Sequence, residues 1–183
     1  MKLILIDGGP ASGKNTLGTL LVEKLKKLEN NVILMDLDTF VEQINPSWIW
    51  KSKLLEETDQ SKARKNFANT INRYLLEDYT IIVIGERFLT KDDISFFMSR
   101  LNINCPVQLY HLCVPFALRR KRLHERGPHS HIDLEKDQKE RDMVLSWPGY
   151  VYDNINTPEV DTDRLATLIQ DSKGTIDIVL PEK

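Results

Sequence analysis

The feature that most constrains this chain is the glycine-rich segment Gly8-Gly9-Pro10-Ala11-Ser12-Gly13-Lys14-Asn15-Thr16. It follows a short apolar run, residues 3–6, and precedes leucines that recur at spacings of three and four residues. The segment therefore lies between an expected strand and an expected helix. It meets the first seven positions of the phosphate-loop pattern G-x-x-x-x-G-K-[ST] and carries Asn15 at the eighth. The sequence thus predicts a strand–loop–helix unit that binds phosphate groups.

The residue types of this segment suit a nucleoside triphosphate. Glycines let consecutive backbone N–H groups turn inward around the β-phosphate, while a helix N-terminus adds partial positive charge. Lys14 has the length to reach the β- and γ-phosphates, so we expect it to act in catalysis as well as in binding. A glycine-rich turn with an incidental lysine is the alternative, which the strand-then-helix context disfavours. The residues expected to bind the nucleotide are Gly9, Ala11, Ser12, Gly13, Lys14, Asn15 and Thr16.

The rest of the chain alternates strand-length apolar runs with helical patterns, which predicts an α/β fold with a parallel sheet. We expect one domain over residues 1–183, since this length suits a single core. The expected strands are residues 3–6, 32–35, 80–84, 107–114 and 151–155. The expected helices are approximately residues 15–29, 59–78, 91–101, 115–126, 133–147 and 161–170. Gly127-Pro128 ends the helix before it and begins an expected lid over about residues 127–133.

Carboxylates follow the second expected strand, where parallel sheets bind ligands. Asp38 is our candidate general base, because a carboxylate there can orient an acceptor hydroxyl and take its proton during phosphoryl transfer. Asp36 is a candidate substrate-binding residue. Both acids have an alternative role as helix-capping turn residues before Phe40. The expected site therefore has an acceptor side at the end of this strand.

Charged residues also follow the third expected strand and fill the helix at 115–126. Glu86 can support the water shell of a metal ion, and Arg87 can bind an anionic group of the acceptor. Arg122 and Arg126, four residues apart, share one helix face and can neutralise the transferring group, so we predict that both act in catalysis. For these groups, ordinary ion pairing is the alternative.

Aromatic and imidazole side chains in two loops contribute less to the functional prediction. Trp48 and Trp50 can stack an aromatic acceptor, although a core or hinge role suits them equally well. His129 and His131 are too few to hold a metal ion, and we expect them to be lid residues.

Charge and composition exclude several classes of partner. The 25 basic and 27 acidic side chains provide no positive field for a polyanion, so we expect no nucleic acid partner. No run approaches the roughly 18 apolar residues of a membrane span, so we expect a cytoplasmic protein without a membrane partner. Cys105 and Cys113 predict neither a disulfide framework nor a zinc site, and Cys113 is expected to be buried. The oligomeric state is left open.

With the phosphate loop, Asp36-Leu37-Asp38, the third-strand turn and the arginine-rich helix in this order, the chain resembles P-loop kinases of the nucleoside monophosphate kinase and shikimate kinase-like group. It is also similar to chloramphenicol phosphotransferase-like and gluconate kinase-like enzymes. The resemblance covers most of residues 1–170 and implies a five-stranded parallel sheet in the order 2-3-1-4-5, flanked by helices. Gly85-Glu86-Arg87 replaces a triple glycine of shikimate kinases, which argues against shikimate as the acceptor.

The loop resembles adenylate kinases most closely, since their Gly-Lys-Gly-Thr differs from Gly13-Lys14-Asn15-Thr16 only at Asn15. On this resemblance Thr16 contacts a phosphate. Magnesium is then held by the Asn15 amide oxygen or through water molecules around Asn15 and Thr16.

These expectations describe an ATP- and magnesium-dependent phosphotransferase whose small-molecule acceptor is unidentified. Two alternatives are a non-catalytic nucleotide-binding regulatory protein, which the departure at Asn15 keeps open, and a nucleoside monophosphate kinase proper. A polynucleotide kinase would require a basic groove that the charge balance does not promise. A GTPase is excluded because Thr90-Lys91-Asp92-Asp93 lies too early in the chain and no Asp-x-x-Gly follows a strand. We expect Thr90 instead to be the N-cap of the following helix, with Asp92 and Asp93 in its first turn.

Overall fold

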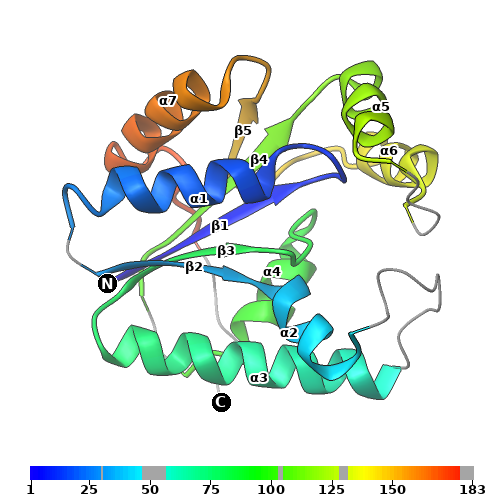
Figure 1. Cartoon of the computed structure of the whole chain (residues 1–183). Helices are drawn as coiled ribbons and strands as arrows, with labels where there is room; N and C mark the ends of the chain where they lie inside the picture. Colours follow the sequence, from blue (N-terminus) through cyan, green and yellow to red (C-terminus); the bar gives the residue numbers. More distant parts are fainter. Residues whose placement is uncertain (30, 47–56, 103–104, 128–131, 178–183) are drawn as a thin grey trace.

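The computed structural model describes residues 1–29, 31–46, 57–102, 105–127 and 132–177. Strands and helices alternate along the chain (Figure 1). The strands are β1 (Lys2–Gly8), β2 (Val32–Asp36), β3 (Thr80–Ile84), β4 (Val107–Cys113) and β5 (Tyr150–Asp153). The helices are α1 (Lys14–Leu25), α2 (Leu37–Ile44), α3 (Glu57–Leu76), α4 (Lys91–Met98), α5 (Phe116–Glu125), α6 (Leu134–Asp142) and α7 (Pro158–Gln170).

The five strands form one parallel sheet in the order β2-β3-β1-β4-β5, as expected. The central strand β1 pairs with β3 on one side and with β4 on the other, so Ile4 lies between Ile82 and Gln108. The carboxyl ends of the strands consequently meet along one edge of the sheet, and the loops that follow them lie together. This edge carries every candidate residue of the expected site that the structure describes.

Helices cover both faces of the sheet, with α1 and α7 on one face and α2, α3 and α4 on the other (Figure 1). Alternate residues of β1 divide between the two cores: Leu3 and Leu5 pack in the cluster that contains Phe67, and Ile4 and Ile6 pack in the cluster that contains Leu21. A strand buried on both faces has no polar side, which explains the uninterrupted apolar run that follows Lys2.

The cap of α4 follows the expected pattern, with Thr90 as N-cap. The Thr90 hydroxyl accepts a hydrogen bond from the Asp93 N–H, and the Asp93 carboxylate accepts one from the Thr90 N–H. This capping box satisfies two backbone donors and places Asp92 and Asp93 in the first turn, as predicted.

Several predicted bounds were wrong. The helix expected over residues 133–147 ends at Asp142, and Trp147 beyond it packs edge-on against His111 with ring centroids 4.7 Å apart. The fifth strand is the edge strand Tyr150–Asp153, in which Val151 is 47% exposed. Cys113, expected to be buried, is exposed at the end of β4, whereas Cys105 is buried. Tertiary packing decides these points.

None of the helices in the described parts of the chain combines the length and apolar character of a membrane span.

Candidate functional site

The phosphate loop connects β1 to α1 in a conformation that few sequences allow. Ala11 and Gly13 have left-handed backbone angles, with φ of 60° and 93°. A Cβ on Gly9 would collide with the Arg119 guanidinium and the Asp137 carboxylate, so a larger residue there would require these side chains to shift. Helix α1 begins at Lys14 without a side-chain cap, and its first N–H groups therefore remain available to an anion.

Two contacts hold this loop from outside. Asn154, just after β5, donates a hydrogen bond from Nδ2 to the Ser12 carbonyl oxygen at 2.6 Å. Arg122 Nη1 lies 3.5 Å from the Ala11 carbonyl oxygen. The Ser12 hydroxyl is buried, and no hydrogen-bond partner for it is found within the described residues. A buried hydroxyl in this position fits a loop that gains a polar ligand.

Lys14 is folded back over the loop. Its Nζ donates hydrogen bonds to the Gly8 and Gly9 carbonyl oxygens at 2.5 and 3.2 Å. Burial lowers the pKa of Lys14, the nearby Arg141 lowers it further, and the negative charge of Asp7 acts against both. A buried ammonium with only neutral carbonyl partners gains most from an anion. Lys14 is therefore placed to exchange these carbonyls for phosphate oxygens.

Asn15, the unusual residue of the loop, contacts the acceptor side. Its Nδ2 donates a hydrogen bond to Asp36 Oδ2 at 3.0 Å. Asp36 Oδ1 accepts the Asp38 N–H at 3.1 Å and caps α2, so the capping alternative for Asp36 is confirmed. Burial raises the pKa of Asp36, against these two hydrogen bonds and the charge of Lys14. Asn15 thus connects the start of α1 to the end of β2.

Asp38 lies in the first turn of α2 and lines a cavity that it shares with Lys14. The residue as a whole is exposed, so its carboxylate stands at the wall of an open cavity. Partial burial of the carboxylate and the negative charge of Asp36 raise the pKa of Asp38 to about 6, although Lys14 opposes the shift. A carboxylate with this pKa is ionised at neutral pH and accepts a proton more readily than an ordinary aspartate.

Glu86 and Arg87 follow β3 and are both ion-paired. Arg64 on α3 donates a hydrogen bond from Nε to Glu86 Oε1 at 2.6 Å. Arg87 Nη1 lies 2.6 Å from Glu140 Oε2 on α6. Both side chains line the same cavity as Lys14. The alternative that Glu86 and Arg87 are ion-paired loop residues is therefore confirmed. Both side chains nevertheless remain in contact with the cavity.

Two cavities lie on either side of the phosphate loop. The first, of about 350 Å³, is lined by residues that include Lys14, Asn15, Asp36, Asp38, Glu86, Arg87 and Arg126. The second, of about 280 Å³, is lined by Gly13, Thr16, Leu17, Arg122, Arg126, Asn154, Asn156 and Pro158. Arg126 belongs to both, so it lies where two ligands would meet. Thr16 and Arg122 face the second cavity, away from the acidic residues.

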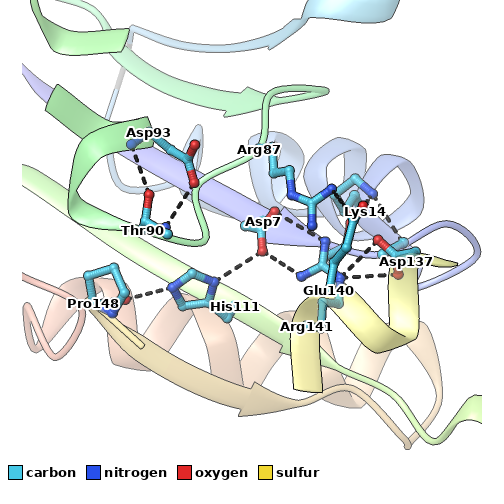
Figure 2. Close-up of polar contacts among 12 residues, drawn as sticks. Asp7, Lys14, Arg87, Thr90, Asp93, His111, Asp137, Glu140, Arg141 and Pro148 are labelled. Carbon is cyan, nitrogen blue, oxygen red and sulfur yellow. Dashed lines mark hydrogen bonds and ion pairs between the residues drawn. The ribbon is translucent and has the colours of Figure 1, made fainter. Parts of the chain in front are cut away.

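Three charged residues of this site were missed by the sequence analysis. Arg141 on α6 donates hydrogen bonds to Asp7, at the end of β1, and to Asp137 on its own helix, and all three line the first cavity. Figure 2 shows Asp7 between Arg141 and His111. Asp7 could have been found from the sequence, because it is an acid at the end of an apolar strand. Nothing in the highly charged segment 133–142 indicated that one face of it is buried.

Part of the expected lid lies outside the described residues, together with His129 and His131; of the lid, the structure describes Gly127, Ile132 and Asp133. Trp48 and Trp50 also lie outside the described residues.

A family model described as "Chromatin associated protein KTI12" matches residues 1–144. The chain belongs to this family. A search of curated proteins found no match. The KTI12 match includes the phosphate loop, the Asp36–Asp38 turn, the arginine-rich helix and α6, and therefore every element that lines the first cavity.

Several solved structures with the same fold are kinases by their descriptions. An unliganded sugar kinase from a Janibacter species is 17% identical, with a TM-score of 0.67 over 93% of this chain and 95% of that one. A putative kinase from Chloroflexus aurantiacus is 17% identical, with a TM-score of 0.65 over 93% and 97%. A shikimate kinase from Aquifex aeolicus is 20% identical, with a TM-score of 0.57 over 93% and 97%. At these identities the likeness shows the fold, which is that of the P-loop kinases.

Proposed function

We propose that this protein is an ATP-dependent phosphotransferase that transfers the γ-phosphoryl group to a hydroxyl or phosphate group of a small-molecule acceptor. The observation that carries the proposal is that Lys14 and Asp38 line one cavity. One is the cation that binds the phosphates of a nucleotide, and the other is a carboxylate that can receive the acceptor proton. The kinase descriptions of the structural neighbours support the same reaction class.

The nucleotide is assigned to the loop and the second cavity. Its phosphates would replace the Gly8 and Gly9 carbonyl oxygens as partners of Lys14 and accept hydrogen bonds from the uncapped N-terminus of α1. The nucleoside would extend into the second cavity, beside Thr16 and Arg122. The γ-phosphate then lies next to the first cavity, which holds the acceptor.

The acceptor side supplies three functions. Asp38 takes the proton from the acceptor hydroxyl as the phosphoryl group moves. Arg126, which lines both cavities, neutralises charge on the transferring group. Arg87 binds an anionic group of the acceptor, which would displace Glu140 from its present ion pair. Exclusion of water from the open cavity is assigned to the segment around residues 127–133.

The residues of the site fit a magnesium ion that arrives with the nucleotide. Oxygen ligands of the kind that magnesium prefers line the first cavity, in Asn15, Asp36, Asp38 and Glu86. In the described chain no group of three or more acidic, cysteine or histidine residues forms a metal site by itself. Magnesium in kinases is commonly held by one or two protein groups, phosphate oxygens and water. We assign the ion to Asn15, with Thr16 supporting its water shell; when bound, it would offset negative charge on the phosphates.

The test is ADP release in the presence of magnesium and ATP, measured against a panel of nucleoside monophosphates, sugars, small hydroxy acids and antibiotics. The wild type is compared with Asp38→Asn and with Glu42→Gln, an exposed acid of the same helix that does not line the cavity. Release that is stimulated by one class of acceptor, lost in Asp38→Asn and kept in Glu42→Gln supports the proposal and names the acceptor. Stimulation by nucleoside monophosphates alone would make the protein a nucleoside monophosphate kinase.

A non-catalytic nucleotide-binding regulatory protein is the second candidate. Two observations favour it: Asn15 replaces the hydroxyl that ordinarily binds magnesium and engages Asp36 instead, and the family description names a chromatin-associated protein rather than an enzyme. This candidate predicts tight binding of ATP, no stimulation by any acceptor and no effect of Asp38→Asn.

A further inference from the structure

Hydrogen bonds and ion pairs connect Asp7 to Arg141 and His111, and Arg141 to Asp137 (Figure 2). Asp7 is 1% exposed. Arg141 Nη1 donates a hydrogen bond to Asp7 Oδ2 at 2.7 Å, and Arg141 Nε donates to both Asp137 oxygens at 3.2 Å. Arg119 Nη1 donates a hydrogen bond to Asp137 Oδ2 at 2.6 Å. These ion pairs therefore join β1, α5 and α6 beside the residues that precede Lys14.

His111 is the other partner of Asp7 and is 2% exposed. Its Nδ1 lies 3.1 Å from Asp7 Oδ2, and its Nε2 lies 2.6 Å from the Pro148 carbonyl oxygen. A backbone carbonyl can only accept a hydrogen bond, and the same holds for an ionised carboxylate. Burial alone would raise the pKa of Asp7, but the hydrogen bond to His111 and the charge of Arg141 hold that pKa well below its usual range, so Asp7 is ionised.

Both ring nitrogens of His111 therefore face acceptors. A neutral imidazole has one N–H group and would leave the other nitrogen with its lone pair directed at an oxygen, at Pro148 or at Asp7. Only the imidazolium donates both hydrogen bonds. The hydrogen-bond partners thus indicate a buried, positively charged His111.

The charge state of this histidine bears on Lys14. Asp7 immediately precedes Gly8, whose carbonyl oxygen accepts a hydrogen bond from Lys14 Nζ, and Asp7 is the carboxylate that acts most strongly on Lys14. An Asp7 with no other cation would hold the lysine ammonium in an ion pair and compete with phosphates for it. The imidazolium and Arg141 are already engaged with Asp7.

We propose that His111 is a positioning residue that, as a buried imidazolium, shares Asp7 with Arg141 and so leaves the ammonium of Lys14 available to nucleotide phosphates. This inference rests on the proposed nucleotide binding at the loop. It adds a role for His111, which lines neither of the two cavities, and for Asp7, which lines the first; both act through Lys14.

The surroundings of His111 bear on its charge. The charged and titratable groups that face it are Asp7 from β1, Arg119 from α5, Arg141 and Asp142 from α6, and Cys113 from β4; a cavity of about 300 Å³ beside Trp147 is lined by all of them except Asp7. Asp7, Asp142 and the Pro148 carbonyl favour the imidazolium, and the two arginines oppose it.

The test combines a protonation measurement with a binding measurement. Long-range proton–nitrogen spectra of protein labelled at its four histidines distinguish an imidazolium from either neutral tautomer. Binding of the β,γ-imido analogue of ATP with magnesium is measured by calorimetry at neutral pH. His111→Gln is compared with His124→Gln, an exposed histidine on α5.

We expect His111 to have two protonated nitrogens at neutral pH. His111→Gln should weaken binding at neutral pH by about tenfold, the factor that about 1.4 kcal/mol gives. His124→Gln should behave as the wild type. If His111→Gln does not fold, substitution of the other three histidines assigns the signal by elimination, and the protonation state of His111 in the wild type decides.

A neutral His111 at pH 7, or unchanged binding in a folded His111→Gln, would overturn the positioning role and leave the proposed function standing. A wild type that binds no nucleotide would instead overturn the proposed function, and the role of His111 toward Lys14 with it.

Discussion

Replacing Asp38 by asparagine should remove a pH-dependent step from the reaction. An aspartate of ordinary pKa is more than nine-tenths ionised at about pH 5. With its pKa raised to about 6, Asp38 is ionised to roughly one part in ten at pH 5 and nine parts in ten at pH 7. If the carboxylate is the base, kcat/KM falls about tenfold per pH unit below this pKa. The acid limb therefore lies about two units above that of an ordinary aspartate.

Asp38→Asn should lower kcat/KM at neutral pH by roughly 10² to 10⁴-fold, the usual contribution of a positioned general base, and should abolish this limb. The γ-phosphate of ATP titrates near pH 6 as well, so the difference between the two pH profiles isolates the carboxylate. Glu42→Gln is the control. Its charge helps to raise the pKa of Asp38, so its loss should move the limb slightly to lower pH without removing it.

The assay is acceptor-dependent ADP release between about pH 4.5 and 8, in the range where the Asp38 carboxylate titrates. A limb that persists in Asp38→Asn beyond the part due to ATP, or a wild-type limb near the ordinary aspartate pKa, would show that the raised pKa of Asp38 has no part in the reaction.

The Asp38 carboxylate also affects folding, because its pKa is higher in the folded than in the unfolded protein and its ionisation therefore costs stability. Asp38→Asn should raise the Tm at pH 8, and the difference from the wild type should vanish below about pH 4, as thermal unfolding would show. Lys14→Ala should lower turnover by about 10²-fold or more with the fold intact by circular dichroism, and retained turnover would exclude it from the reaction. Arg126→Ala should reduce kcat more than nucleotide affinity, whereas Arg120→Ala, an exposed arginine of the same helix, should change neither; equal losses of binding and turnover in Arg126→Ala would count against its assignment. Gly9→Ala should weaken nucleotide binding in calorimetry because its Cβ collides with the Arg119 guanidinium, and unchanged binding would mean that the loop adapts.

The phosphate loop and the strands themselves were predictable because their signals are local. The loop is a continuous segment whose glycines, lysine and flanking periodicities are all visible in the sequence, and the capping box of Thr90 and Asp93 lies within four residues. The strands were recognised as apolar runs because a doubly covered parallel sheet buries both faces of each strand. The order of the strands came from the resemblance to P-loop kinases.

The candidate site was predicted in part for the same reason. Asp36, Asp38, Glu86 and Arg87 were located because they follow strands, and the carboxyl ends of parallel strands meet at one edge. The capping role of Asp36 was an alternative that the sequence offered, and the structure confirms it. Its hydrogen bond with Asn15 was not predictable, because it joins residues 21 positions apart in the chain.

The sequence by itself determined the fold class, the phosphate loop and part of the set of charged residues near it. The tertiary structure alone decided which of those charges are buried together. His111 and Arg141 meet Asp7 across 104 and 134 residues of chain, and α6 has no apolar stripe that would reveal its buried face. Burial and ion pairing depend on what packs from other elements, and these set the pKa of Asp38 and the availability of Lys14.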